Sequence, residues 1–443
     1  MSQRNLSILL LTTAVSYACY VRGEQNPYAR YVGDGLAAIR QEALENVPDR
    51  ALFDGAMRGM IDVLQKRGDE HSQFLPESEA DPLKTEIRQQ FGGIGVRIGF
   101  EGKPPQLTIV GPPDPGTPAA SANLLVGDQI LTIDGENTAG VSMADVLRRI
   151  RGEPGTTVKL TIQQRHAAKP RTIELVRKII HIDSILGERR DPDGRWIFIT
   201  PSDPRIAHVR IASFGDHTAA ELSHVLEELT SSCVEAVVLD LRDNEGGSLD
   251  AAVAVCQMLL PASKTIVETR GRGQTLRERY ETKSNGPYRD LPLVVMVNQN
   301  SASASEIVAA SLQDHGRAPV AGERSYGKGT VQQLLPLESG KSLLKLTWAS
   351  FWRPSGANIH HESDAADNAL WGVLPDSGLE RELSEEEYAA YRSYRNERDG
   401  MNEEHPAVAA ENSAPSQPEF VDEQFQLAVK YLKSKLDKRK APR

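Results

Sequence analysis

The pattern of apolar and polar residues divides the chain into segments of different periodicity. From Gly92 to about residue 180, short β-type runs alternate with Gly and Pro turns and with one helix, which Ser142 caps and Gly152 follows. Over residues 27–88, apolar side chains instead recur every three or four residues, as in amphipathic helices: Val32, Leu36, Ile39, Ala43, Phe53, Met57, Met60 and Leu64. The pattern predicts a helical domain over residues 27–87 and a compact, mainly-β domain over residues 88–180.

From residue 183 onward, strands alternate with helices. The runs Val237–Leu241 and Leu293–Val297 are apolar throughout, which is typical of strands buried on both faces of a sheet. We therefore predict an α/β core over residues 183–394.

The last part of the chain changes character again. Residues 395–420 are charged and rich in Pro, Ala and Ser, which predicts a flexible linker. An amphipathic helix over Glu423–Leu436 is expected to dock on the core through its apolar side. This helix and a basic tail make up a C-terminal segment over residues 421–443.

An apolar run near the start of the sequence predicts export. Ser7 to Tyr20 follows Arg4 and is shorter than the ~20 residues that a membrane-spanning helix needs. We expect a signal peptide over residues 1–20 that is cleaved after Ala18, with an uncleaved anchor as the alternative; the residues before Cys19 suit lipidation poorly. The protein is accordingly expected outside the cytoplasm, either periplasmic or anchored and facing outward.

Composition and charge exclude several classes of protein. The 443 residues are enough for two or three domains, and the net charge of −10 argues against binding of nucleic acid. The cysteines Cys19, Cys233 and Cys256 form no disulfide framework. His and Cys do not cluster at ligand spacing, and the adjacent His360 and His361 would point apart, so we expect neither a metal nor another cofactor.

Candidate nucleophiles lie in the segment Asn300–Glu306, with the sequence NSASASE, between an apolar strand and a helix expected over Glu306–His315. Backbone N–H groups at the start of a helix stabilise a developing oxyanion. The position does not distinguish Ser301, Ser303 and Ser305, and a lone serine there is more often a helix cap.

The candidate base is Lys328, which lies between two glycines in the segment Gly322–Gln332, because no histidine occupies a comparable setting. Burial has to lower the pKa of such a lysine before it can accept a proton. An exposed lysine in a turn is the alternative. The segment Leu239–Gly247, with the sequence LDLRDNEGG, ends an apolar strand in a glycine turn whose N–H groups suit a bound oxygen, although such glycines often serve sterics alone.

Together these segments resemble the carboxyl-terminal processing peptidases, which are tail-specific serine proteases. The matches run in family order over most of residues 30–380: DEHSQF near residue 69, FGGIGVRI at 91, GDQILTIDG at 127, LDLRDNEGG at 239, SASASEIVAASLQDHGRAPVAGERSYGKGTVQ at 301 and GVLPD at 372. The resemblance implies a multidomain α/β fold, with a crotonase-like protease core, an inserted PDZ domain over residues 88–180 and an N-terminal helical domain.

The same resemblance implies roles for individual residues. Ser303 would be the nucleophile, Lys328 the base and Gln332 the residue that positions the lysine. Because four residues of straight strand span ~13 Å, the chain would have to bend near Gly329 for Lys328 and Gln332 to touch. The remaining implied residues are an oxyanion hole made by Ala304 with Gly246 or Gly247, and a PDZ loop for the substrate carboxylate made by Gly92, Gly93, Ile94, Gly95 and Val96.

The implied function is a serine endopeptidase that cleaves exported proteins near their C-termini. Its partners would be proteins or peptides with free C-termini, and an uncleaved N-terminal segment would add association with a membrane. Glu245, where the family often has proline, and Ala357, where it usually has arginine, bear on specificity. Two alternatives are a non-catalytic PDZ scaffold and an acyl-thioester enzyme of the crotonase type. The presence of both Ser303 and Lys328 argues against the scaffold, and the PDZ-like segment and the lysine argue against the acyl-thioester enzyme.

Overall fold

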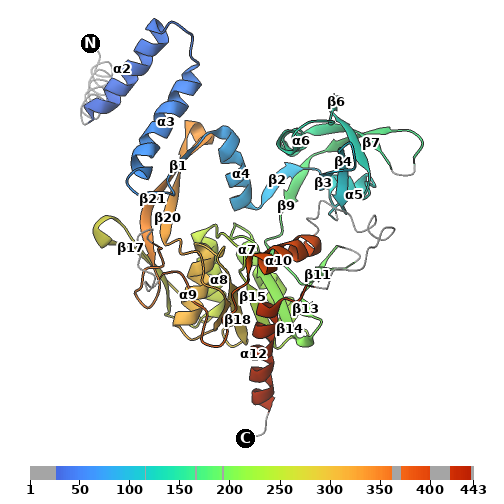
Figure 1. The fold of residues 1–443 in the computed structure, drawn as a ribbon, viewed down its shortest axis with the longest axis vertical. Helices are drawn as coiled ribbons and strands as arrows, with labels where there is room; N and C mark the ends of the chain where they lie inside the picture. Colours follow the sequence, from blue (N-terminus) through green and yellow to red (C-terminus); the bar gives the residue numbers. More distant parts are fainter. Residues whose placement is uncertain are drawn as a thin grey trace, which may run out of the picture. The chain divides into compact units, whose positions relative to one another are not determined.

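The computed structural model describes residues 26–114, 116–164, 167–191, 194–361, 371–399 and 420–440 (Figure 1). The expected export segment and most of the expected linker therefore lie outside the described residues. No helix in the described part of the chain is both long and apolar enough to cross a membrane. The fold consists of two compact units: one contains the described residues up to Ala80 with Gln332–Thr347, and the other contains Asp81–Val331 and the chain from Trp348.

The first unit is largely helical, as the periodicity predicts. A short strand, β1, was not expected; it pairs with Leu343–Lys345 in antiparallel fashion and buries Phe74. Residues from the far end of the sequence thus complete this unit. Its elements, the last three of which extend beyond it, are α2 (Pro27–Glu42), α3 (Asp49–Gln65), β1 (Gln73–Leu75), α4 (Glu77–Arg88), β20 (Thr330–Leu337) and β21 (Ser342–Trp352).

The core of the second unit is a mostly parallel sheet buried on both faces, which explains the wholly apolar strands. Its successive strands are β10 (Ile185–Leu186), β14 (Asp203–Ile211), β15 (Ala236–Asp240), β18 (Leu293–Val297) and β19 (Val320–Gly322). Side chains alternate across a strand. Leu239 and Val295 therefore pack in the core that includes α7 (Thr218–Thr230), α8 (Leu249–Leu259) and α9 (Ala304–Asp314), while Val238 and Met296 pack against α12 (Glu423–Lys440).

The residues between α4 and β10 form the expected mainly-β domain with a core of its own. Ser142 caps its helix as predicted, because the Ser142 side chain accepts a hydrogen bond from the N–H of Asp145. The main sheet runs in the order β3 (Arg97–Glu101), β4 (Gln106–Gly111), β5 (Gln129–Ile133), β7 (Thr157–Gln163) and β8 (Arg171–Val176), with α6 (Met143–Ile150) packed against it. Strands β2 (Gln90–Gly93) and β9 (Lys178–His181) pair separately.

Three expected boundaries differ from the structure. Helix α9 starts at Ala304 rather than Glu306, and α12 continues to Lys440. Helix α10 (Glu385–Arg398) extends into the expected linker of residues 395–420. The buried Asp399 directly after this helix forms an ion pair with Arg210 of β14, and composition alone does not reveal such a tertiary partner.

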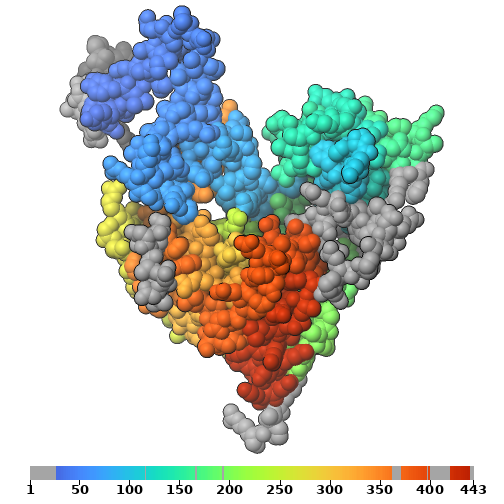
Figure 2. Space-filling view, viewed as in Figure 1, coloured from blue at the N-terminus to red at the C-terminus, as the bar shows by residue number. Residues whose placement is uncertain are grey.

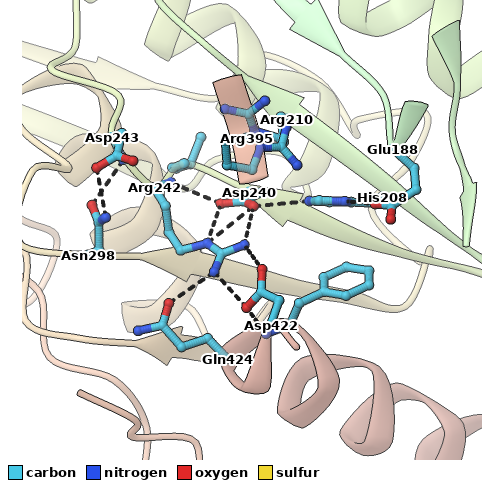
Figure 3. A network of polar contacts seen from close by, with 12 residues as sticks. Glu188, His208, Arg210, Asp240, Arg242, Asp243, Asn298, Arg395, Asp422 and Gln424 are labelled. Carbon is cyan, nitrogen blue, oxygen red and sulfur yellow. Dashed lines mark hydrogen bonds and ion pairs between the residues drawn. The ribbon is translucent and has the colours of Figure 1, made fainter. Parts of the chain in front are cut away.

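A network of charged side chains lies on the face of the core sheet that α12 covers (Figure 3). His208 of β14 is buried, with its Nδ1 2.5 Å from a carboxylate oxygen of Glu188 and its Nε2 3.0 Å from one of Asp240. Both ring nitrogens face carboxylate oxygens, an arrangement that favours the doubly protonated imidazolium. Burial alone would lower the pKa of His208, but hydrogen bonds to Asp240 and Glu188 raise it above its ordinary value.

The partners of His208 show the complementary shift. Burial alone would raise the pKa of Glu188, but the hydrogen bond from His208 and the ion pair with Arg398 lower it to about 2. The pKa of Asp240 is also lowered: the nearby charge of Arg242 and the hydrogen bond from His208 outweigh the opposing effect of burial. The network thus stabilises the imidazolium form of His208 between the carboxylates of Glu188 and Asp240.

This arrangement predicts that stability falls at alkaline pH. The pKa of His208 is higher in the folded than in the unfolded protein. Its contribution to the free energy of unfolding is therefore complete at a pH below its ordinary pKa of about 6.5, and it is lost as the pH rises through the pKa of the folded state. We expect His208→Gln to lower the free energy of unfolding near pH 6 by about 3–5 kcal/mol, because it leaves buried carboxylates unpaired. Urea unfolding as a function of pH measures the effect, and the difference between variant and wild type should shrink above neutrality.

The matched control is His224→Gln, since the His224 side chain on α7 is 73% exposed. This variant should follow the wild-type pH dependence. Parallel loss of stability with pH in His208→Gln and wild type would contradict the assignment of the alkaline transition to His208.

Candidate active site

Among the three candidate serines, only Ser303 is partly exposed. The hydroxyl of Ser301 donates to the carbonyl of Leu241 at 2.8 Å, and that of Ser305 donates to the carbonyl of Asn244 at 2.9 Å. Both side chains are fully buried. Ser301 and Ser305 therefore fasten this segment to the turn after β15, which leaves Ser303 as the serine that substrate can reach.

The backbone at Ser303 is in a rarely populated conformation, with φ 55° and ψ −111°. The residue stands between the turn that follows β18 and the first residue of α9. Such conformations cost about 1–3 kcal/mol in residues other than glycine and concentrate at functional sites. The sharp strand-to-helix turn presents Ser303 at the start of a helix, where N–H groups have no partner within the helix.

The turn over residues 240–247 lies directly against this serine. The carbonyl of Asn244 accepts the N–H of Ala302 at 3.0 Å. A Cβ atom built on Gly246 would lie 2.8 Å from the Cβ of Ser303 and 3.0 Å from the nitrogen of Ala304, so any larger residue would displace the nucleophile segment. The structure thus brings Gly246 and Ala304 together.

The two glycines of this turn differ in their surroundings. The N–H of Gly246 donates to the side chain of Asn244 at 2.8 Å. Gly247 is exposed and approaches the carbonyl of Phe214, which a Cβ on Gly247 would overlap at 2.0 Å. The sequence left both glycines open for the oxyanion hole. In the structure, Gly246 lies against Ser303 with its N–H donated to Asn244, and Gly247 is exposed.

The carboxylate of Glu306, in the first turn of α9, connects the segment that carries Ser303 to the loop that carries Lys328. This lysine loop comprises residues 323–329, between β19 and β20. It accepts hydrogen bonds from the N–H groups of Ser303 at 2.8 Å, Gly327 at 2.6 Å and Lys328 at 2.8 Å, and from the hydroxyl of Ser325 at 2.6 Å. Glu306 is fully buried, and burial raises its pKa although these four donors oppose the shift. One carboxylate therefore fixes the backbone at both Ser303 and Lys328.

Two other segments of the chain form backbone hydrogen bonds with the lysine loop. The carbonyl of Gly327 accepts the N–H of His361 at 2.9 Å, and that of Gly329 accepts the N–H of Phe351 at 2.7 Å. Lys328 is partly buried between these anchor points. Its backbone position is thus determined on both sides.

Gln332 belongs to the first unit, whereas Ser303 and Lys328 belong to the second. Its side-chain amide donates to the hydroxyl of Thr347 at 3.3 Å, and that hydroxyl donates to Asp69 at 2.8 Å. Asp69 begins the DEHSQF motif, so the motif connects to the strand that carries Gln332.

The expected PDZ loop is shorter than predicted. Gly92 and Gly93 lie within β2, paired with β9, and only Ile94, Gly95 and Val96 connect β2 to β3. A Cβ atom on Gly92 would lie 1.9 Å from the carbonyl oxygen of Gly152. Close packing of two backbones therefore explains the first glycine of the run, and the placement of Gly92 and Gly93 in a loop was wrong.

Comparisons with known proteins identify the family of this chain. Residues 205–378 match the model of peptidase family S41, and residues 109–164 match that of a PDZ domain. A carboxy-terminal-processing protease from Bartonella bacilliformis is 34% identical over 397 residues, which cover 88% of this chain and 82% of the relative. The chain belongs to peptidase family S41. The fold class inferred from the motifs, an α/β peptidase with a PDZ domain, is confirmed, and this S41 protein is a serine-type endopeptidase that acts on protein substrates.

Two further proteins match over about three quarters of this chain. A carboxyl-terminal-processing protease from Picosynechococcus sp. is 32% identical over 329 residues, which cover 74% of each chain. Among solved structures, the photosystem II D1 C-terminal processing protease has 30% sequence identity and a TM-score of 0.42, with 78% of this chain and 86% of that chain covered.

Several residues that shape the site of this S41 peptidase were missed from the sequence. Glu306 follows the serine motif at helical spacing, which is the signal of a residue that reaches back to the start of its own helix. Asp243 accepts hydrogen bonds from Asn298, Asn300 and Tyr388, and the last of these lies 145 residues away along the chain. No local signal identifies such a partner.

The position of Glu306 predicts that its charge is needed for turnover. Glu306→Gln keeps the size of the side chain but replaces one acceptor oxygen by a donor, so buried N–H groups lose their partner at a cost of about 1–3 kcal/mol. We expect kcat to fall roughly 10- to 100-fold while the chain remains folded, as measured by steady-state cleavage of an unfolded protein substrate and by circular dichroism.

Glu221→Gln provides a matched control. Glu221, in the first turn of α7, likewise accepts the N–H and hydroxyl of Ser184, but it lies outside the candidate site. Its substitution should change stability without lowering kcat. Equal effects of both substitutions on kcat would count against a special position of Glu306.

Proposed function

We propose that Ser303 and Lys328 form the catalytic dyad of this peptidase. The observation that carries the proposal is the shared carboxylate of Glu306, which binds the backbone N–H groups of both residues. The partial exposure of Ser303, beside the buried hydroxyls of Ser301 and Ser305, supports the same choice.

In the proposed reaction, the neutral amine of Lys328 accepts the hydroxyl proton of Ser303 as its oxygen attacks a peptide carbonyl. The N–H of Ala304 and one from the glycine turn, at Gly246 or Gly247, stabilise the oxyanion. Lys328 then protonates the departing amine, and water hydrolyses the acyl-enzyme. Gln332 would orient the lysine.

The dyad is tested by Ser303→Ala and Lys328→Ala. Loss of the nucleophile or the base should reduce cleavage of an unfolded protein by at least about 10³-fold. Lys328→Arg should be equally inactive, because a guanidinium does not release its proton near neutral pH. Lys283→Ala is the control: Lys283 is exposed shortly after the end of β17 (Leu276–Glu281), and the variant should cleave as wild type does. Cleavage by Ser303→Ala at the wild-type rate would eliminate this site.

We further propose that the PDZ domain receives the free C-terminus of the substrate. Strand β3 lies at the edge of its sheet within the described residues, with Ile98 and Phe100 only partly buried. An extended peptide can add to such an edge, while the N–H groups of residues 94–96 face the terminal carboxylate. This would bring substrates to the protease by their C-terminal residues.

This recognition mode predicts a difference between two forms of one substrate. A peptide with a free, apolar C-terminus should be cleaved with a KM at least about tenfold lower than the same peptide with an amidated C-terminus, because a charge-assisted hydrogen bond contributes about 1.5–3 kcal/mol. The kcat values should be similar. A KM that is indifferent to amidation would rule out carboxylate capture, even if the dyad is correct.

An extracytoplasmic site of action is proposed on the basis of the apolar run over residues 7–20. Exported proteins would then be the substrates, and an uncleaved segment would keep the enzyme at the membrane. Sequencing of the mature N-terminus decides between cleavage after Ala18 and retention.

A further inference from the structure

The guanidinium of Arg242 uses all of its hydrogen-bond donors inside the second unit. Its Nε donates to Asp240 at 3.0 Å, and its Nη2 donates to Asp240 at 2.7 Å and to Asp422 at 2.8 Å. Its Nη1 donates to Asp422 and to Gln424, both at 3.0 Å. Arginine has five N–H donors, so the set is complete. The ring of Tyr391 lies over the same group at 4.5 Å.

Three of these five hydrogen bonds are accepted by Asp422 and Gln424, at the start of the C-terminal helix α12 (Figure 3). Arg242 is fully buried, and so is the side chain of Gln424, whose amide donates in turn to Glu323 at 2.8 Å. Asp422 is the second anion of Arg242, which shares its first anion, Asp240, with the buried His208. Without Asp422 and Gln424, Arg242 would be a buried cation with most of its donors unpaired.

Helix α12 also makes ordinary apolar contacts with the sheet, through Ala428, Val429, Leu432 and Leu436. Figure 2 shows the orange and red atoms of α10 and α12 covering this side of the second unit. These contacts explain why the helix docks, but they do not require charged groups at its start. The polar residues at that end therefore need a separate explanation.

Arg242 connects helix α12 to the turn over residues 240–247, which carries the proposed oxyanion donor and is called the oxyanion turn below. It lies two residues before Asn244, which holds Ala302 and Ser305, and four before Gly246, which lies against Ser303. A shift of the Arg242 backbone would be transmitted directly to these residues. The contacts of Asp422 and Gln424 thus bear on the position of the N–H groups proposed for the oxyanion.

We propose that Asp422 and Gln424 are positioning residues for the oxyanion turn, so that the C-terminal helix is part of the catalytic architecture and not only a cover for the sheet. The inference rests on the proposed function of Ser303 and the glycine turn. It assigns a role in turnover to a helix about 120 residues beyond the nucleophile in the sequence.

The test compares substitutions along one helix of the full-length protein. Asp422→Asn keeps the shape but loses the charge and one acceptor, and Gln424→Met loses the acceptor for Nη1. Displacing an oxyanion donor impairs the transition state more than the bound substrate, so kcat should fall roughly 10- to 100-fold with KM within about twofold of wild type. Asp422→Glu, which restores the charge, should recover part of the loss.

Two matched controls separate positioning from docking. Asp437→Asn removes an exposed ion pair of the same helix with Arg205, and Leu432→Ala weakens its apolar contact. Both should keep kcat within about twofold at temperatures where they are folded, although Leu432→Ala should unfold at lower temperature. If Asp422→Asn only lowers the unfolding temperature, as Leu432→Ala does, or only raises KM, the inference is wrong.

A second readout does not depend on cleavage. Hydrogen exchange of the backbone over residues 240–247 should be faster in Asp422→Asn than in wild type and unchanged in Asp437→Asn. Unchanged exchange in Asp422→Asn would overturn the inference even if the dyad is correct. Wild-type cleavage that does not depend on Ser303 would instead overturn the proposed function, and the exchange result would still decide whether Asp422 fixes the turn.

Discussion

The buried carboxylate of Glu306 is the contact on which the proposed chemistry depends. It accepts N–H groups from the serine segment and from the lysine loop, and these segments follow different strands of the core sheet. A buried charge is tolerated only when its hydrogen bonds are complete. The proposed nucleophile and base can therefore not move independently, and the strained backbone of Ser303 is held by a contact that would be costly to break.

A buried cation has the corresponding role on the other side of the site. Arg242 fixes the end of β15 in the same way as Glu306 fixes the start of α9, and its partners come from β15 and from α12. Both ions lie near the carboxyl ends of parallel strands, where α/β folds commonly place their ligands. The sheet brings the segments of the site to one edge, and the hydrogen bonds of Glu306 and Arg242 then fix the positions of their backbones.

Much of the secondary structure could be predicted from the chain. Strands such as Val237–Leu241 and Leu293–Val297 are apolar because both faces of their sheet are covered, and Ser142 caps its helix through local contacts. The errors arise where the partner is remote: α10 continues past the expected boundary because a buried ion pair anchors its end, and Gly92 belongs to a strand because another backbone lies against it. Local composition does not carry this information.

The periodicity of each segment, the order of the motifs and hence the family can be recognised from the chain alone, because they depend only on neighbouring residues and on their order. Among Ser301, Ser303 and Ser305, local chemistry offered no choice, and only the motif pointed to Ser303. The tertiary structure distinguishes the three serines: the hydroxyls of Ser301 and Ser305 donate to carbonyl groups about 60 residues away in the sequence. Hydrogen bonds between distant segments, such as those of Glu306 and Arg242, exist only once the sheet has brought those segments together.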